Sequence, residues 1–131
     1  MGRPLDGRAL PRGSRDMPLK GAPIPPAERT LLGARLETGM AAFNTLLPIV
    51  KGQRIGLFAG SGVGKSSLLA NFATGLEADV VVLALIGERG RELAEFVQNT
   101  LGPEGLARTV IVTATADQSP LLRRRCAWSA M

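Results

Sequence analysis

Residues 59–66 read Ala-Gly-Ser-Gly-Val-Gly-Lys-Ser, a run whose residue types could hold a phosphate group. They fit the pattern of Gly or Ala, four residues, then Gly-Lys-Ser/Thr, in which small residues let successive backbone N–H groups point at phosphate oxygens. We therefore predict a phosphate-binding loop. Its predicted binding residues are Gly60, Ser61, Gly62, Val63, Gly64, Lys65 and Ser66.

Two side chains of this loop could do chemistry of their own. The Lys65 ammonium would bridge β- and γ-phosphate oxygens, and the Ser66 hydroxyl would be a ligand of Mg²⁺. An ordinary glycine-rich turn before a helix would explain neither residue. The pattern therefore favours a nucleoside triphosphate bound with Mg²⁺ over a purely structural turn.

A carboxylate, Glu88, lies just beyond an apolar run at residues 80–86. In an open parallel sheet the carboxyl ends of the strands face the ligand crevice, so this side chain could approach the γ-phosphate. There it could accept a hydrogen bond from the attacking water and align it for transfer. Alternatively, Glu88 belongs to a solvated charge cluster at the start of the next helix, with Arg89, Arg91 and Glu92. Spacing alone leaves both interpretations open.

The elements that must position these residues alternate between strand and helix. An apolar segment at residues 54–59 predicts a short strand that runs directly into the loop. Apolar spacing predicts a helix over residues 65–74, and Gly75 stands where a helix C-terminus commonly takes a left-handed residue. The apolar residues of this helix form one stripe that would pack on a sheet: Leu68, Leu69, Phe72 and Leu76.

The second half of the pattern completes the alternation. Residues 80–86 are apolar without alternation and rich in β-branched residues, which predicts a central parallel strand covered on both faces. A second helix follows Gly90 and ends near Gly102, and residues Thr109–Ala114 predict a third strand. We therefore expect an α/β fold with a parallel sheet and helices on its faces.

The start of the chain has a different composition. Residues 1–30 hold six of the nine prolines, which remove backbone donors and favour an extended connector. Residues 40–47 predict one short helix that closes at a proline.

Composition excludes several classes of site. With no histidine and a single cysteine, zinc sites and Ser-His or Cys-His triads are excluded, and Cys126 is predicted to be a small core residue.

The longest apolar run has seven residues, against the roughly 20 that a bilayer requires. Residues 31–122 carry seven Lys or Arg against eight Asp or Glu, so the basic excess lies at the ends and argues against nucleic-acid binding. The absence of a signal-peptide pattern predicts a cytoplasmic protein.

Three blocks together resemble the flagellar and type III secretion export ATPases: residues 52–66, 87–92 and 101–108. These enzymes are relatives of the catalytic subunit of the rotary ATP synthase. The resemblance implies a P-loop NTPase fold with a RecA-like parallel sheet and flanking helices, incomplete in this sequence. Residues 31–131 would be the N-terminal part of that nucleotide-binding domain.

The same resemblance implies roles for individual residues. Lys65 would contact phosphate, Ser66 would bind Mg²⁺, and Glu88 would activate the attacking water, with Arg89 beside it near the γ-phosphate. The cofactors would be ATP and Mg²⁺. The family's magnesium-organising aspartate, trans-acting arginine and aromatic adenine pocket would lie outside this sequence.

The resemblance also implies a setting. Family members form homo-oligomeric rings, as hexamers, that hydrolyse MgATP and assist the unfolding and delivery of exported substrates. Partners would be export-apparatus proteins and stalk or regulator proteins, and nucleic acid would not be among them. The protein would lie at the cytoplasmic face of a secretion apparatus, with at most peripheral membrane association.

Three alternatives remain open at this point. A rotary ATP synthase subunit shares the loop and the Glu-Arg turn but usually has threonine where Gly90 stands. A non-catalytic nucleotide-binding or assembly fragment would bind without turnover. A ring-shaped RNA translocase of the same core fold would require RNA affinity that depends on salt.

Overall fold

The computed structural model describes residues 4–7, 9, 13–60 and 62–131. Within them the chain forms a 3₁₀ turn (Pro26–Glu28), α1 (Ala41–Thr45), α2 (Lys65–Gly75), β1 (Val81–Ile86), α3 (Gly90–Glu95), a π-helical segment (Phe96–Leu101), α4 (Gly102–Ala107), β2 (Thr109–Ala114) and α5 (Pro120–Ala130). No helix in the described residues is both long enough and apolar enough to cross a membrane.

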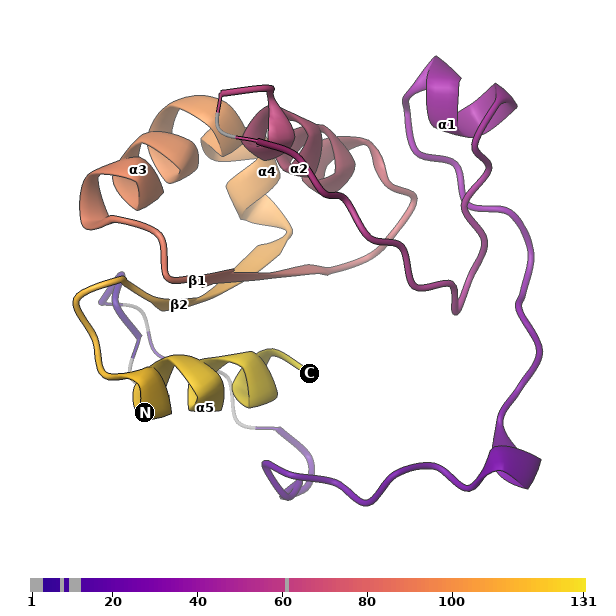
Figure 1. Cartoon of the computed structure of the whole chain (residues 1–131), viewed down its shortest axis with the longest axis horizontal. Helices are drawn as coiled ribbons and strands as arrows, with labels where there is room; N and C mark the ends of the chain where they lie inside the picture. The colour runs from indigo at the N-terminus through magenta and orange to yellow at the C-terminus, as the bar shows by residue number, and fades with distance from the viewer. Residues whose placement is uncertain (1–3, 8, 10–12, 61) are drawn as a thin grey trace.

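The two strands form a parallel pair that helices cover on both faces. Val81 pairs with Thr109 at one end of the ladder and Ile86 pairs with Ala114 at the other. Helices α2, α3 and α4 lie on one side of the pair, and α5 lies on the other (Figure 1). Parallel strands need such crossover helices, because each strand must start again at the same end of the sheet. The predicted α/β class is confirmed.

The main core lies between the sheet and the helices that follow the loop. Its buried residues are Ala70, Ala73, Leu85, Phe96 and Leu101. The most buried residues of α2 are therefore alanines, not the predicted leucine stripe, and their small side chains let the helix approach its neighbours closely. Phe96 and Leu101 are five residues apart. The π-helical geometry, with its i→i+5 bonds, places both on the core face.

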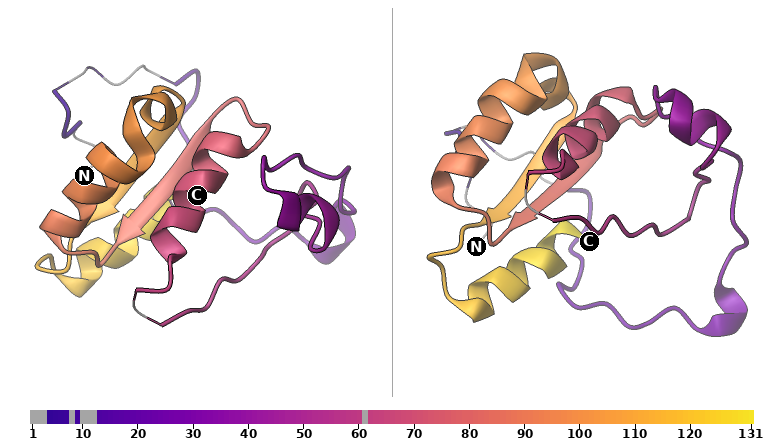
Figure 2. Two further views of the ribbon diagram at one scale, coloured as in Figure 1. Left: turned by 90° about the horizontal axis from the view of Figure 1, so that it is seen from above. Right: turned by 45° about the horizontal axis from the view of Figure 1, so that its top comes forward.

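The predicted strand at residues 54–59 is wrong. These residues are exposed and irregular, and they run beside the folded part without joining the sheet (Figure 2). Ile55 is 51% exposed and Phe58 is 95% exposed. Extended backbone becomes a strand only when a neighbour satisfies its N–H and C=O groups, and no described segment pairs with this one.

The predicted central position of β1 is also wrong for the described residues. Its sheet has two strands in the order β1-β2, so β1 has one hydrogen-bonded neighbour. Helices do lie on both sides of the sheet, but Val82 and Ala84 of β1 are exposed, so the predicted cover on both faces is only partial. The apolar run also carries no information on the number of neighbouring strands.

Helix α4 was not predicted, because the Gly-Pro pair suggested only a helix end. Gly102 has φ +67° and ends the π-helical segment. Pro103 then stands in the first turn of α4, where its missing N–H has no intrahelical partner to lose. The same two residues thus end one helix and begin the next.

Gly75 is required for a different reason from the predicted one. Its φ is not positive, but a Cβ built on it would lie 2.5 Å from the backbone oxygen of Thr38. Thr38 is fully buried, and its hydroxyl donates to Asn44 Oδ1 over 2.8 Å. The backbone N–H of Glu77 donates to the carbonyl of Glu37 over 3.0 Å. Close packing of two backbones therefore holds residues 37–39 against the end of α2.

Arg108 ties the start of β2 to the same end of α2. Its Nε donates to the carbonyl of Ala73 over 3.2 Å, and a second guanidinium N–H donates to the carbonyl of Leu76. Carbonyls at a helix C-terminus lack intrahelical donors, so a cation there stabilises the helix end.

Other sequence predictions are met in part. A short helix does occur within residues 40–47, although α1 is only five residues long. Its Phe43 packs edge-on against Phe72 of α2, with ring centroids 4.9 Å apart. Cys126 is buried in α5, which confirms its prediction as a core residue. The division of the chain at residue 30 stays a prediction.

Candidate nucleotide-binding site

The glycine-rich loop leads directly into the first turn of α2. Gly62 has φ +78° and Gly64 has φ +93°, a left-handed region that side chains with a Cβ rarely adopt. A Cβ at either position would meet nothing within 4 Å, so these glycines are needed for backbone conformation and not for lack of room. The space around the loop is open, as close approach of a phosphate to the backbone requires. Ser61 lies outside the described residues.

Lys65 is the first residue of α2, and Gly64 is its N-cap. Lys65 and Ser66 are both exposed. The first N–H groups of a helix have no intrahelical acceptor and carry the positive end of its dipole, which favours an anion beside them. An ammonium group in this position adds a full positive charge where a phosphate would bind.

A hollow of about 270 Å³ connects this helix start with the end of β1. Its lining residues are Lys65, Ser66, Leu69, Leu85, Glu88, Glu92, Leu93, Glu95, Phe96 and Thr100. The structure therefore brings together three residues predicted from separate motifs, namely Lys65, Ser66 and Glu88.

Glu88 is positioned by backbone contacts to the neighbouring strand. The N–H of Gly87 donates to the carbonyl of Ala114 over 2.7 Å, and the N–H of Ala116 donates to the carbonyl of Glu88 over 3.0 Å. Gly87 itself has φ +82°, so the chain turns sharply out of the sheet at this residue. The Glu88 side chain is left half-buried at the carboxyl end of the strand, as predicted.

Arg89 is the predicted site residue that the structure does not bring into the hollow. Its Nη1 lies 2.9 Å from Oε1 of Glu92, one turn along α3, and the Arg89 side chain is 68% exposed. The charge cluster that competed with a catalytic interpretation of this turn therefore exists for Arg89 and Glu92, while Glu88 faces the hollow.

Sequence reasoning did not assign three polar residues of the lining to the site: Glu92, which it placed only in the alternative charge cluster, Glu95 and Thr100. Glu92 and Glu95 are three positions apart and so share a helix face, a spacing that could have indicated Glu95. Thr100 could not be found this way, because it lies in the π-helical segment, where the ordinary helical period does not apply.

The donor atoms fit Mg²⁺ bound together with a nucleotide. The hollow offers hydroxyl and carboxylate oxygens, which this cation prefers. Among the described residues no group of three or more His, Cys, Asp or Glu could enclose a metal ion. A cation held by one hydroxyl, phosphate oxygens and water is consistent with this partial set of ligands.

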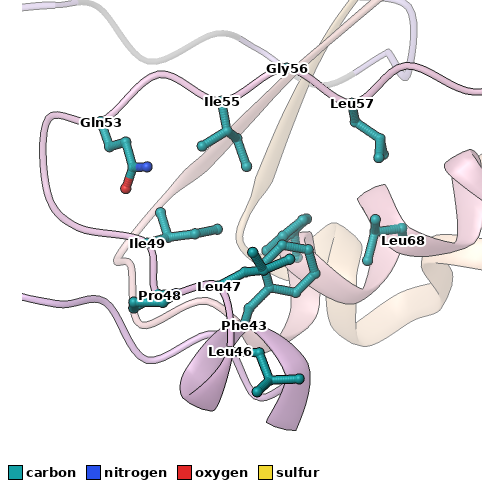
Figure 3. A pocket seen from close by; sticks show the side chains of 11 residues that line it. Phe43, Leu46, Leu47, Pro48, Ile49, Gln53, Ile55, Gly56, Leu57 and Leu68 are labelled. Atoms are coloured by element: carbon teal, nitrogen blue, oxygen red, sulfur yellow. The ribbon is translucent and has the colours of Figure 1, made fainter.

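A larger hollow of about 370 Å³ lies elsewhere, between α1, residues 48–57 and α2. Ile55 and Leu57 point into it from the irregular segment, opposite Ile49 and Leu68 (Figure 3). Gln53 contributes the single polar side chain of this lining. With no ionisable group, this hollow has no means of holding a phosphate or moving a proton.

Residues 39–131 match the ATP synthase alpha/beta family, nucleotide-binding domain. The chain belongs to this family. The match covers the glycine-rich loop, both strands and the Glu88 turn, so the family includes every part of the site described above.

Individual relatives agree with this assignment. The flagellum-specific ATP synthase of Bacillus subtilis (strain 168) is 46% identical over 129 residues, covering 98% of this chain and 30% of that protein. The flagellum-specific ATP synthase of Salmonella typhimurium (strain LT2) is 52% identical over 122 residues, covering 93% of this chain and 27% of that protein.

A solved structure of the assembled ATPase EscN in complex with its central stalk EscO, from the enteropathogenic E. coli type III secretion system, is 42% identical with a TM-score of 0.86. The match covers 98% of this chain and 32% of the matched chain in that structure. The resemblance to flagellar and type III export ATPases is confirmed. The chain spans about a third or less of the length of these relatives.

Proposed function

We propose that the chain carries the phosphate-binding part of a MgATP-hydrolysing site in a flagellar or type III protein-export ATPase. The observation that carries this proposal is the common hollow of Lys65, Ser66 and Glu88. These are the cation, the hydroxyl and the carboxylate that phosphoryl transfer to water requires. Membership of the ATP synthase alpha/beta family supports adenine nucleotide as the ligand.

Each residue would act through the group it presents. The loop amides and the Lys65 ammonium bind phosphate oxygens, and the Ser66 hydroxyl binds Mg²⁺, which when bound neutralises charge on the phosphates. The Glu88 carboxylate accepts a hydrogen bond from water and orients it towards the γ-phosphate. Arg89, next along the chain, reaches the same phosphate by rotating its side chain away from Glu92.

We propose for this protein the kind of assembly that is described for its relatives. EscN is described both as an assembled ATPase and in complex with a central stalk protein. We extend to this protein a homo-oligomeric ring, taken to be a hexamer, with stalk or regulator proteins, export-apparatus proteins and exported substrates as partners. Its place would be the cytoplasmic face of the secretion apparatus, where hydrolysis assists the unfolding and delivery of substrates.

Binding of MgATP to the chain tests the phosphate-binding part of this proposal. Isothermal titration of MgATP into the Lys65→Ala chain should give at least tenfold weaker binding than wild type, because a hydrogen bond to a charged group contributes about 1.5–3 kcal/mol. The matched control is Lys51→Ala, since Lys51 is an exposed lysine that does not line the hollow.

Equal affinity of the Lys65→Ala and wild-type chains would contradict the assignment of the loop. Weakening by Lys51→Ala to the same degree would show that only net charge matters. MgATP binding without turnover in the full-length protein would favour a non-catalytic role.

A further inference from the structure

The turn beside Glu88 contains an ion pair. One member of the pair, Glu92, lines the hollow, and the other, Arg89, does not. Arg89 Nη1 lies 2.9 Å from Glu92 Oε1 at the start of α3. Glu92 lines the hollow together with Lys65 and Glu88, whereas Arg89 does not. A single carboxylate thus faces both the hollow and the guanidinium.

An anion that enters the hollow would act on Arg89 and Glu92 in opposite ways, because the two side chains carry opposite charges. Among the described lining residues, Lys65 is the one cation, and the carboxylates are Glu88, Glu92 and Glu95. A polyphosphate in this space would be repelled by Glu92 and would attract Arg89. Phosphate is also a better partner for guanidinium than a lone exposed carboxylate, because it offers several charged oxygens to the planar fork.

The existing pair is weak enough to be exchanged. The side chains of Arg89 and Glu92 are 68% and 43% exposed, so water screens their attraction. Arg89 directly follows Glu88, and its backbone is therefore already at the rim of the hollow. Exchange of partners requires rotation of one long side chain and no movement of the sheet.

We propose that Glu92 is a positioning residue that competes with the nucleotide phosphates for Arg89. This proposal rests on the proposed function, because it requires a polyphosphate in the hollow. Glu92 holds the guanidinium outside until phosphate displaces it, so that binding of ATP places Arg89 beside Glu88. The cost of breaking the pair is then part of the measured affinity for ATP.

The proposal predicts different effects for two chemically identical substitutions. Glu92→Gln removes a repelling charge and also releases Arg89. Glu95→Gln removes a repelling charge from the same lining but leaves the Arg89 pair intact. ATP should therefore bind about two- to fivefold more tightly to Glu92→Gln than to Glu95→Gln, the range expected for an exposed ion pair. In an Arg89→Ala background this difference should disappear.

The experiment measures the dissociation constant of ATP in EDTA for six chains: wild type, Glu92→Gln, Glu95→Gln, and each of these with Arg89→Ala. EDTA removes Mg²⁺, so that effects on metal binding do not enter the comparison. Far-UV circular dichroism and thermal unfolding of each chain check that the substitutions leave the fold intact. A readout in the Arg89→Ala background separates competition from a structural role, because destabilisation of α3 would affect both backgrounds alike.

Two results would overturn the proposal in distinguishable ways. Equal tightening by Glu92→Gln and Glu95→Gln, or the same difference with and without Arg89, would refute competition and leave the proposed function standing. Absent binding of MgATP to the wild-type chain, or MgATP binding that Lys65→Ala does not weaken, would refute the proposed function and the competition together.

Discussion

Gly75→Ala should destabilise the chain although alanine is the better helix former. A Cβ at Gly75 would lie 2.5 Å from the Thr38 oxygen, 3.3 Å from the Thr38 carbonyl carbon and 3.5 Å from Gly39 Cα. The neighbouring atoms are backbone, so no side-chain rotation can relieve the clash. The segment that would have to move is held by the buried Thr38, whose N–H donates to Asn44 Oδ1 and to Glu37 Oε1, each over 3.1 Å.

The magnitude follows from two opposing terms. Overpacking of a well-packed contact costs about 1–3 kcal/mol, and replacing glycine by alanine in a helix returns up to about 1 kcal/mol. The net loss in the free energy of unfolding should lie between about 0 and 3 kcal/mol, with a midpoint of about 1.5 kcal/mol. The matched control is Gly90→Ala at the first position of α3, where a Cβ would meet nothing within 4 Å and φ is not positive. That variant should gain about 0.4–1 kcal/mol.

Urea unfolding followed by far-UV circular dichroism gives both values. Opposite signs for the two variants are expected, whereas helix propensity alone would make both stabilising. A Gly75→Ala chain as stable as the Gly90→Ala chain would show that contact with Thr38 does not constrain the end of α2.

Three further predictions concern other parts of the molecule. In the full-length protein, Glu88→Gln should retain MgATP binding and lose most turnover, and undiminished hydrolysis would disprove its role in orienting water. Arg108→Met should lower the free energy of unfolding by about 1.5–3 kcal/mol, because the carbonyls of Ala73 and Leu76 lose a charged donor. Urea unfolding measures this loss, and a decrease in the free energy of unfolding of less than about 0.5 kcal/mol would contradict the prediction. Burial raises the pKa of the Cys126 thiol above its ordinary value of 9.0, so the folded state holds this proton more tightly. That contribution to stability is present below pH 9.0 and is lost as pH rises through the folded-state pKa. Wild type should therefore lose more stability than Cys126→Ala between about pH 8 and pH 10, as measured by urea unfolding at both pH values. Equal losses for the two chains would contradict this prediction.

Local pattern was enough to predict the parts of the fold whose stability depends on nearby residues. The third predicted strand coincides with β2 (Thr109–Ala114), and the predicted helix after the loop differs from α2 (Lys65–Gly75) by one residue. Both have an apolar face that pairs or packs within the described chain. The position of Glu88 followed from a general property of parallel sheets, the convergence of strand ends at the ligand crevice.

Features that depend on distant contacts were not predictable in the same way. Residues 54–59 have a strand's composition, but pairing needs a neighbouring backbone that the sequence of the segment does not specify. The role of Gly75 depends on Thr38, which is far away in sequence and close in space. The side-chain direction of Arg89 stayed open for a different reason, because its pair with Glu92 is local and the sequence offered that pair and the nucleotide site as alternatives.

Amide shifts in a ¹⁵N-labelled chain titrated with MgATP test the central claim most directly. We expect the largest shift changes at Gly62, Gly64, Lys65 and Ser66 and at Glu88, because these residues surround the proposed phosphate site. Residues of the larger apolar hollow, such as Leu46 and Leu57, should change little. Shift changes centred on that apolar hollow, or none at the loop with MgATP in excess, would contradict the account.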